Sequence, residues 1–249
     1  MRIRLLSFTL LVLTARNAAS AQALGKFPPD SLVNVRVIAK NTPVIQVIGM
    51  MRNFSTDLGV RCQFCHVGNE GQPLEQFDFA SDAKRNKQVA RQMMQMVANI
   101  NRRLDSIPGK PGPAIEVNCS TCHRGVSRPI PLASLIAETA EAGGADSAVR
   151  VYKRLREQYF GRDAYNFGEP SLNSAALRLA RSRKFAEAMA LLAVNEEHFP
   201  NSANLSVTRG NVSLLQGDTA AAERAFREAL RKDPRNGDAT NRLRAIGRQ

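Results

Sequence analysis

Two short motifs combine residue types that can carry out metal or redox chemistry. Each has two cysteines three positions apart and a histidine directly after the second, as CQFCH at residues 62–66 and CSTCH at residues 119–123. The whole chain has only four cysteines and three histidines, and six of these seven residues fall in the two motifs. This concentration at one repeated spacing indicates that both motifs have the same chemical role.

The spacing favours covalent haem attachment over other uses of cysteine. Two thiols at positions i and i+3 lie on one side of a helical turn, where both can form thioethers with the two vinyl groups of a haem. The next residue then presents its imidazole to the iron. A disulfide scaffold and a zinc site are the alternatives. Both are less favoured, because a disulfide scaffold needs no histidine after each pair of cysteines and a zinc site does not need the CxxCH pattern twice. We predict two covalently attached c-type haems. The first uses Cys62, Cys65 and the ligand His66, and the second uses Cys119, Cys122 and the ligand His123.

Each iron also needs a ligand on its other side, and methionine is the natural candidate. The one further histidine, His198, is expected in the last turn of a helix, where the helix dipole favours a cation. Residues 43–59 have helical periodicity, and their apolar stripe includes Met51 but not Met50. The periodicity therefore favours Met51 as the distal ligand of the first haem. Gly59 is expected to end this helix.

A second helix is predicted over residues 81–104, upstream of the second motif. Its apolar face carries both Met93 and Met96, and periodicity alone does not separate them as the distal ligand. Packing in a protein core is the alternative role for each of these methionines.

Residues 50–66 and 88–125 resemble the cytochrome subunit of photosynthetic reaction centres, which places a methionine on a helix ahead of each CxxCH motif. The resemblance covers roughly residues 40–130 and implies Met96 as the distal ligand of the second haem. It places Met51 in the equivalent position for the first. The family subunit has four haems, one of them with two histidine ligands, whereas this chain has cysteines for two. This difference favours a separate dihaem electron carrier, with photosynthesis implied by the resemblance alone.

The first residues read as an export signal. Arg2 and Arg4 precede the apolar run of residues 5–13, and small residues at 18–23 offer a cleavage site after Ala21. We predict a signal peptide at residues 1–21 and a periplasmic protein, associated at most with the inner-membrane surface. A retained signal anchor is the alternative.

The chain has a formal net charge of +13, which favours a partner of opposite charge. The basic residues are spread along the sequence without interleaved aromatic residues, so we do not expect nucleic-acid binding. We expect redox proteins with acidic docking surfaces, including a membrane-bound electron-transfer complex.

The second half of the chain contains an internal repeat. Residues 184–200 align with residues 218–234 at an offset of 34, the length of a tetratricopeptide unit. Residues 146–160 resemble a further helix of the repeat, and residues 235–248 would cap the end. We therefore expect a mainly α fold with little regular sheet: a dihaem cytochrome c domain over residues 22–135, and a tetratricopeptide-like helical stack over residues 136–249. The stack either binds a protein partner in its groove or serves as a docking spacer.

These features together predict an electron carrier rather than an enzyme. With a histidine and a methionine on each iron, no coordination position stays open for a substrate. A dihaem peroxidase is the enzymatic alternative, but it needs one open iron with acid–base residues above it, and no such set is evident. A repeat-based adaptor with a haem module is the other alternative.

Overall fold

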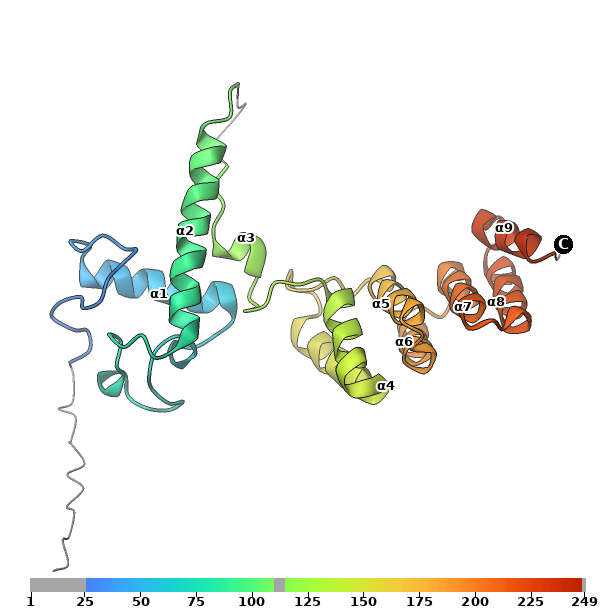
Figure 1. Cartoon of the computed structure of the whole chain (residues 1–249), viewed down its shortest axis with the longest axis horizontal. Coiled ribbons are helices and arrows are strands. Elements are labelled where there is room, and N and C mark those ends of the chain that lie inside the picture. Colours follow the sequence, from blue (N-terminus) through green and yellow to red (C-terminus); the bar gives the residue numbers. More distant parts are fainter. Residues whose placement is uncertain (1–25, 110–114, 248–249) are drawn as a thin grey trace, which may run out of the picture. The chain divides into compact units, whose positions relative to one another are not determined.

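The computed structural model describes residues 26–109 and 115–247 (Figure 1). These residues form nine α-helices, and their one β-bridge is the isolated antiparallel pair Val67–Asp78. The expected mainly α fold is therefore confirmed. None of the described helices is long and apolar enough to span a membrane. The predicted signal peptide at residues 1–21, with its cleavage site at Ala21, lies outside the described residues.

The CxxCH motifs lie in a part of the chain where short and long helices alternate with loops. In order, its helical elements are α1 (Val44–Leu58), the 3-10 helices η1 (Cys62–Phe64) and η2 (Leu74–Gln76), α2 (Arg85–Asp105) and α3 (Cys119–His123). The helices α1 and α2 confirm the two that periodicity predicted. Gly59 follows α1 with a φ of +63°, a left-handed conformation that favours glycine and ends the helix as expected.

The described residues form two compact units, which do not follow the order of the chain. One contains residues 26–49 and 62–94, and the other contains residues 50–61 and 95–247 without 110–114. Both α1 and α2 therefore contribute residues to each unit.

Few side chains of α1 and α2 are buried. Val47 is the only buried residue of α1, and α2 has none. The predicted apolar face of α2 is largely exposed, with 38% of Met93 and 45% of Met96 accessible to solvent. This stretch of polypeptide thus leaves an apolar helix face without a protein core above it.

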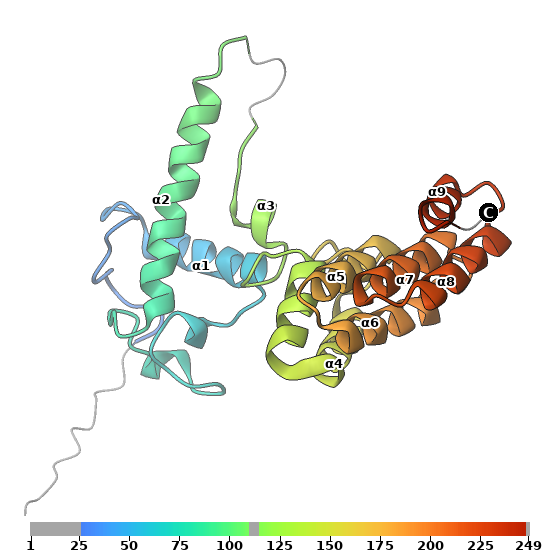
Figure 2. The ribbon, with the colours of Figure 1, turned by 45° about the vertical axis from the view of Figure 1, so that its right-hand side comes forward.

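The remaining helices form a stack of antiparallel pairs (Figure 2). They are α4 (Leu132–Tyr159), α5 (Glu169–Arg181), α6 (Phe185–His198), α7 (Ala203–Gln216), α8 (Thr219–Lys232) and α9 (Gly237–Ala245). The starts of α5 and α7 are 34 positions apart, and so are those of α6 and α8. The period found in the sequence therefore recurs in the helices, while a tetratricopeptide identity stays a prediction.

Two features of the stack were not anticipated. The helix α4 is broken at Gly144, whose φ of +75° and ψ of −178° are not helical. His198 does end α6, but burial, followed by the charge of Arg156, lowers the pKa of its imidazole. The position of His198 in the last turn is as expected, while desolvation opposes the preference of the helix end for a cation.

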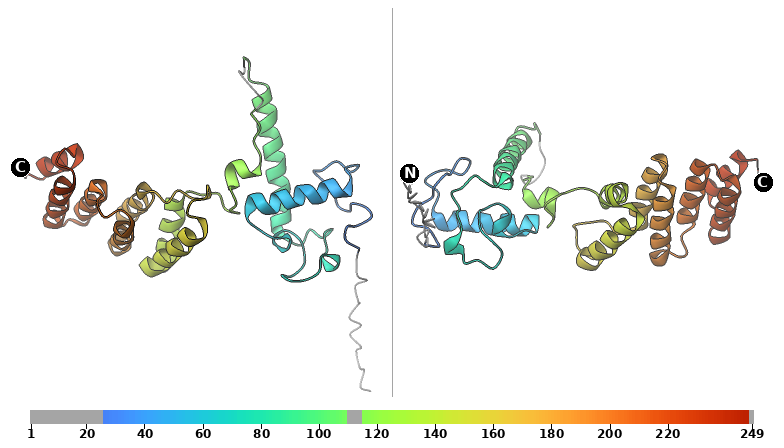
Figure 3. Two further views of the ribbon diagram at one scale, coloured as in Figure 1. Left: turned by 180° about the vertical axis from the view of Figure 1, so that it is seen from behind. Right: turned by 60° about the horizontal axis from the view of Figure 1, so that its bottom comes forward.

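Tight packing between α7 and α8 explains why the repeat has a glycine at position 210. Successive helices of the stack lie side by side (Figure 3), and the ring of Phe226 on α8 is fully buried against α7. A Cβ atom added to Gly210 on α7 would lie 2.3 Å from that ring. The glycine therefore allows the two helices to approach closely.

We predict that Gly210→Ala lowers the free energy of unfolding by about 1–3 kcal/mol, because the added methyl group overpacks the Phe226 ring. Gly237→Ala is the matched control, since Gly237 begins α9 and a Cβ atom added there would have no neighbouring atom within 4 Å. Denaturant unfolding followed by circular dichroism measures both. Equal stability of the two variants would contradict this packing.

Candidate functional site

The first CxxCH motif folds as a tight helical turn. The carbonyl oxygen of Cys62 accepts hydrogen bonds from the backbone N–H groups of Cys65, at 3.2 Å, and of His66, at 2.9 Å. The two cysteines and the histidine therefore have the i, i+3, i+4 geometry of one turn, as the sequence predicted.

Side chains from the start of α2 hold this turn in place. The Lys84 ammonium donates to the carbonyl oxygen of Gln63 at 2.5 Å, and the Asn86 amide donates to that of Phe64 at 3.0 Å. Both carbonyls belong to η1, where they have no partner within a longer helix. Sequence analysis did not identify Lys84 or Asn86, because these bonds join residues that are more than 20 positions apart.

The imidazole of His66 lies against an aromatic cluster. Its ring meets that of Phe79 edge-on at a centroid distance of 5.0 Å, and Phe79 also contacts Phe27 and Phe77. Burial, followed by the positive charge of Lys87, lowers the pKa of His66 to about 4, while a distorted hydrogen-bond contact with the Phe79 backbone acts in the opposite direction. The Nδ1 atom is buried and makes no hydrogen bond of normal geometry. His66 is thus held as a neutral imidazole, the form that ligates a metal.

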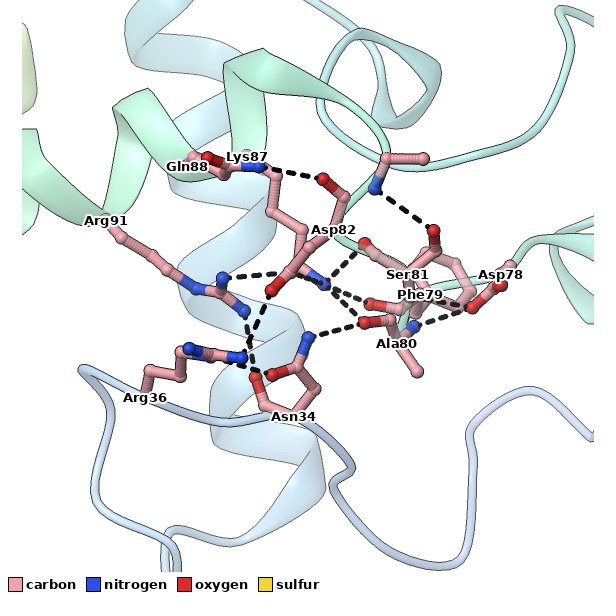
Figure 4. A network of polar contacts seen from close by, with 11 residues as sticks. Asn34, Arg36, Asp78, Phe79, Ala80, Ser81, Asp82, Lys87, Gln88 and Arg91 are labelled. Atoms are coloured by element: carbon pink, nitrogen blue, oxygen red, sulfur yellow. Dashed lines mark hydrogen bonds and ion pairs between the residues drawn. The ribbon is translucent and has the colours of Figure 1, made fainter.

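A charged network beside the first motif joins the loop before α2 to the helix (Figure 4). The carboxylate of Asp82 pairs with Arg91 at 2.9 Å, with Lys87 at 3.2 Å and with Arg36 at 3.5 Å. Hydrogen bonding by the Arg91 guanidinium holds the pKa of Asp82 well below its usual range. The network carries more positive than negative charge.

Lys87 occupies the centre of this network. Only 11% of its side chain is exposed. Its ammonium donates to three successive backbone carbonyls, at 2.9 Å to Phe79, 3.0 Å to Ala80 and 2.9 Å to Ser81 (Figure 4). These bonds compensate the burial of the cation and fix the loop that carries the aromatic ring against His66.

The second CxxCH motif forms the short helix α3, which has a complete N-terminal cap. The Asn118 side chain accepts a hydrogen bond from the backbone of Thr121, and the Thr121 hydroxyl accepts one from the backbone of Asn118. Arg124 ends the helix in the left-handed conformation, with a φ of 49°. Capping at both ends allows five residues to hold a helical turn.

The imidazole of His123 has a defined orientation. Its Nδ1 atom lies 2.9 Å from the carbonyl oxygen of Val126, and a carbonyl only accepts, so Nδ1 carries the proton. The Nε2 atom is then left with a lone pair for a metal. The acceptor belongs to Val126 because the backbone turns back directly after α3.

A side-chain amide on α2 holds the chain just before the second motif. Asn101 donates from Nδ2 to the carbonyl oxygen of Val117 and accepts at Oδ1 from the Val117 backbone N–H, both at 2.8 Å. This paired bond fixes the register between α2, which carries Met96, and the segment leading to Cys119. Sequence analysis missed Asn101, although its ability to bond both backbone groups of one residue is a property of the amide side chain.

The end of α1 also supports the second motif. The Gly125 backbone N–H donates to the carbonyl oxygen of Asp57 at 2.8 Å. A Cβ atom on Gly59 would lie 2.1 Å from the carbonyl oxygen of Gly125, so only glycine allows this approach. Burial, followed by the negative charge of Asp57, raises the pKa of the Cys119 thiol.

The thiols and the methionines are available for further bonding. All four cysteines are free, with Cys122 exposed and the other three half-buried. Burial is also the largest cause of the raised pKa of the Cys65 thiol. Met50 and Met51 lie half-buried on α1, and both Met93 and Met96 are exposed on α2. Solvent exposure therefore does not show which methionine of each pair would be the distal ligand.

Together these residues fit a covalently bound haem at each motif. Free thiols lie at i and i+3 of a helical turn, and the following imidazole is neutral at His66 and directed by Val126 at His123. In this arrangement the two thiols could form thioethers with one haem, and the imidazole would be the ligand of its iron.

Comparison with known families agrees with this interpretation. Residues 69–154 match the model of the family described as Photosynthetic reaction centre cytochrome C subunit. The matched range includes Met96 and the whole second motif, and it begins just after His66. The match confirms the resemblance of residues 88–125 and leaves residues 50–66 outside the matched range. It indicates a c-type cytochrome that binds haem and exchanges electrons with redox partners.

We predict that Asn101→Ala loosens the attachment of residues 117–123 to α2. Loss of two hydrogen bonds should lower the free energy of unfolding by about 1–3 kcal/mol and accelerate hydrogen exchange at the Val117 amide. Asn99→Ala is the matched control, because Asn99 is exposed on the same helix. Unchanged protection of Val117 in Asn101→Ala would show that the amide pair does not hold this segment.

Proposed function

We propose that this protein is an exported dihaem c-type cytochrome that carries electrons between redox partners. Cys62 and Cys65 attach the first haem, and Cys119 and Cys122 attach the second. The observation that carries the proposal is the hydrogen bond from His123 Nδ1 to the Val126 carbonyl on a capped CxxCH turn, since it leaves Nε2 to ligate iron. A bound haem would supply one-electron redox chemistry.

Residues of this chain would supply both axial ligands of each iron. His66 and His123 are the proximal ligands in this proposal, and Met51 and Met96 are the distal ones. Ligation by methionine raises the reduction potential relative to histidine and leaves no position for oxygen or peroxide. Electron transfer without substrate binding follows from this ligand set.

The remaining parts of the chain give the carrier a location and partners. The segment at residues 1–21 serves as a cleaved signal peptide, with the mature protein in the periplasm. Cleavage removes Arg2, Arg4 and Arg16, so the mature chain keeps 32 basic and 22 acidic residues and a formal net charge of +10. This charge steers it toward acidic docking surfaces on redox proteins, an attraction that weakens as salt is added. The helical stack over residues 136–249 offers a surface for a further protein partner, and the cytochrome domain spans residues 22–135.

The number of haems per chain tests the proposal. We expect a pyridine haemochrome assay on protein exported by a host with cytochrome c maturation to give two haems per chain. The double variant Cys119→Ala/Cys122→Ala should give one, because each pair of thiols attaches its own haem. A value of zero for the native chain, or an unchanged value for the variant, would contradict the proposal.

The methionine ligands are tested by paired substitutions. Met96→Ala and Met51→Ala should each remove half of the charge-transfer absorption that methionine–iron bonds give in the oxidised protein, because each leaves one iron without its sulfur ligand. Their neighbours provide matched controls, with Met93→Ala and Met50→Ala expected to leave the band intact. Loss of the band in a control instead of its partner would reassign that ligand.

A further inference from the structure

The two proximal histidines differ in what surrounds Nδ1. His123 Nδ1 donates to the Val126 carbonyl oxygen at 2.9 Å, whereas His66 Nδ1 is buried without a hydrogen bond of normal geometry. A hydrogen bond from Nδ1 to a carbonyl makes the imidazole a stronger electron donor through Nε2. Stronger donation stabilises ferric iron, so this difference alone gives the His66 site the higher potential.

Lys87 occupies the backbone acceptor that lies nearest to His66. The Phe79 residue lies directly against the His66 ring, but its carbonyl oxygen already accepts a hydrogen bond from the Lys87 ammonium at 2.9 Å. The same ammonium holds the next two carbonyls of the loop. The backbone acceptor nearest to His66 is therefore shared with a cation, which makes it a weaker acceptor for the imidazole than the Val126 carbonyl is for His123.

The charges around the two sites act in the same direction as the hydrogen bonds. The cations near His66 and Cys65 are Lys84, Lys87 and Arg91. Lys87 and Arg91 form ion pairs with Asp82, and so does a fourth cation, Arg36. Asp78 adds a second carboxylate, whose Oδ1 accepts from backbone N–H groups. Four cations thus face two carboxylates.

At the second site, a carboxylate lies close to one of the attachment cysteines. Asp57 lies close enough to Cys119 to affect its thiol, and the Asp57 backbone is bonded to Gly125 at 2.8 Å. Arg124 follows His123 but is exposed, where solvent screens its charge. A nearby carboxylate favours the ferric state and a nearby ammonium disfavours it, most strongly when the ammonium is buried, as Lys87 is.

We infer that the haem attached at Cys62 and Cys65 has the higher reduction potential of the two, and that Lys87 is the positioning residue that sets the difference. This inference rests on the proposed function, since it requires both haems. The haem at the first motif is then the weaker reductant of the two and holds its electron more tightly.

Spectroelectrochemical titration of the holoprotein tests the inference. We expect two one-electron waves whose redox equilibrium favours the first haem by at least tenfold, which corresponds to a separation of about 59 mV. Lys87→Met should lower the upper wave and leave the lower wave in place. Asp57→Asn should raise the lower wave alone, so the two variants together assign the waves without another probe.

Control variants separate charge from structural damage. Lys87→Arg keeps the cation and should retain most of the upper potential, and Lys153→Met removes the same charge from an exposed position on α4 and should move neither wave. If Lys87→Met fails to load haem, Arg91→Gln removes the second cation near His66 and should also lower the upper wave.

The outcomes distinguish this inference from the proposed function. A native protein with fewer than two haems would refute the proposed function itself. Two haems that titrate as a single wave, or a lower wave that responds to Lys87→Met, would overturn the inference and leave the dihaem carrier standing. An upper wave that moves equally in Lys153→Met would likewise overturn the role of Lys87.

Discussion

The structure depends on one geometric constraint: each CxxCH sequence must be held as a single helical turn. Five residues do not form a stable helix alone, because nucleating a turn costs more than its few hydrogen bonds return. At the second motif, Asn118 and Thr121 supply the missing stability as a reciprocal cap, and Asn101 anchors the preceding segment. At the first motif, Lys84 and Asn86 satisfy the carbonyls of the turn. Three of these supports come from α2 and the residue just before it, so the helix that presents the candidate methionine also shapes both attachment sites.

The two halves of the chain bury their apolar residues in different ways. The stack of α4–α9 has a conventional core of alanine, leucine and a few aromatic side chains that are almost fully buried. By contrast, α2 has no buried residue and exposes Met93 and Met96. A haem attached beside this helix would cover its apolar face, and cofactor binding would then contribute to folding as well as to function.

Local patterns carried most of what the sequence could predict. The CxxCH spacing, the apolar periodicity of α1 and α2 and the 34-residue offset between α6 and α8 are all properties of short windows, and the structure agrees with each. Contacts between residues outside such windows could not be predicted from the sequence. The bonds of Asn101 to Val117 and of Lys87 to the Phe79 carbonyl depend on how loops return to α2, which no periodicity encodes. The hydrogen bond from His123 to the Val126 carbonyl could not be foreseen either, because it depends on the left-handed turn at Arg124.

The central claim is that both motifs attach haem through thioethers, and peptide mass mapping of the exported protein tests it most directly. After proteolysis, the account predicts that the peptide containing residues 62–66 and the peptide containing residues 119–123 each carry the mass of one haem. Either peptide recovered at its unmodified mass, from cells that mature other c-type cytochromes normally, would contradict the account at that motif.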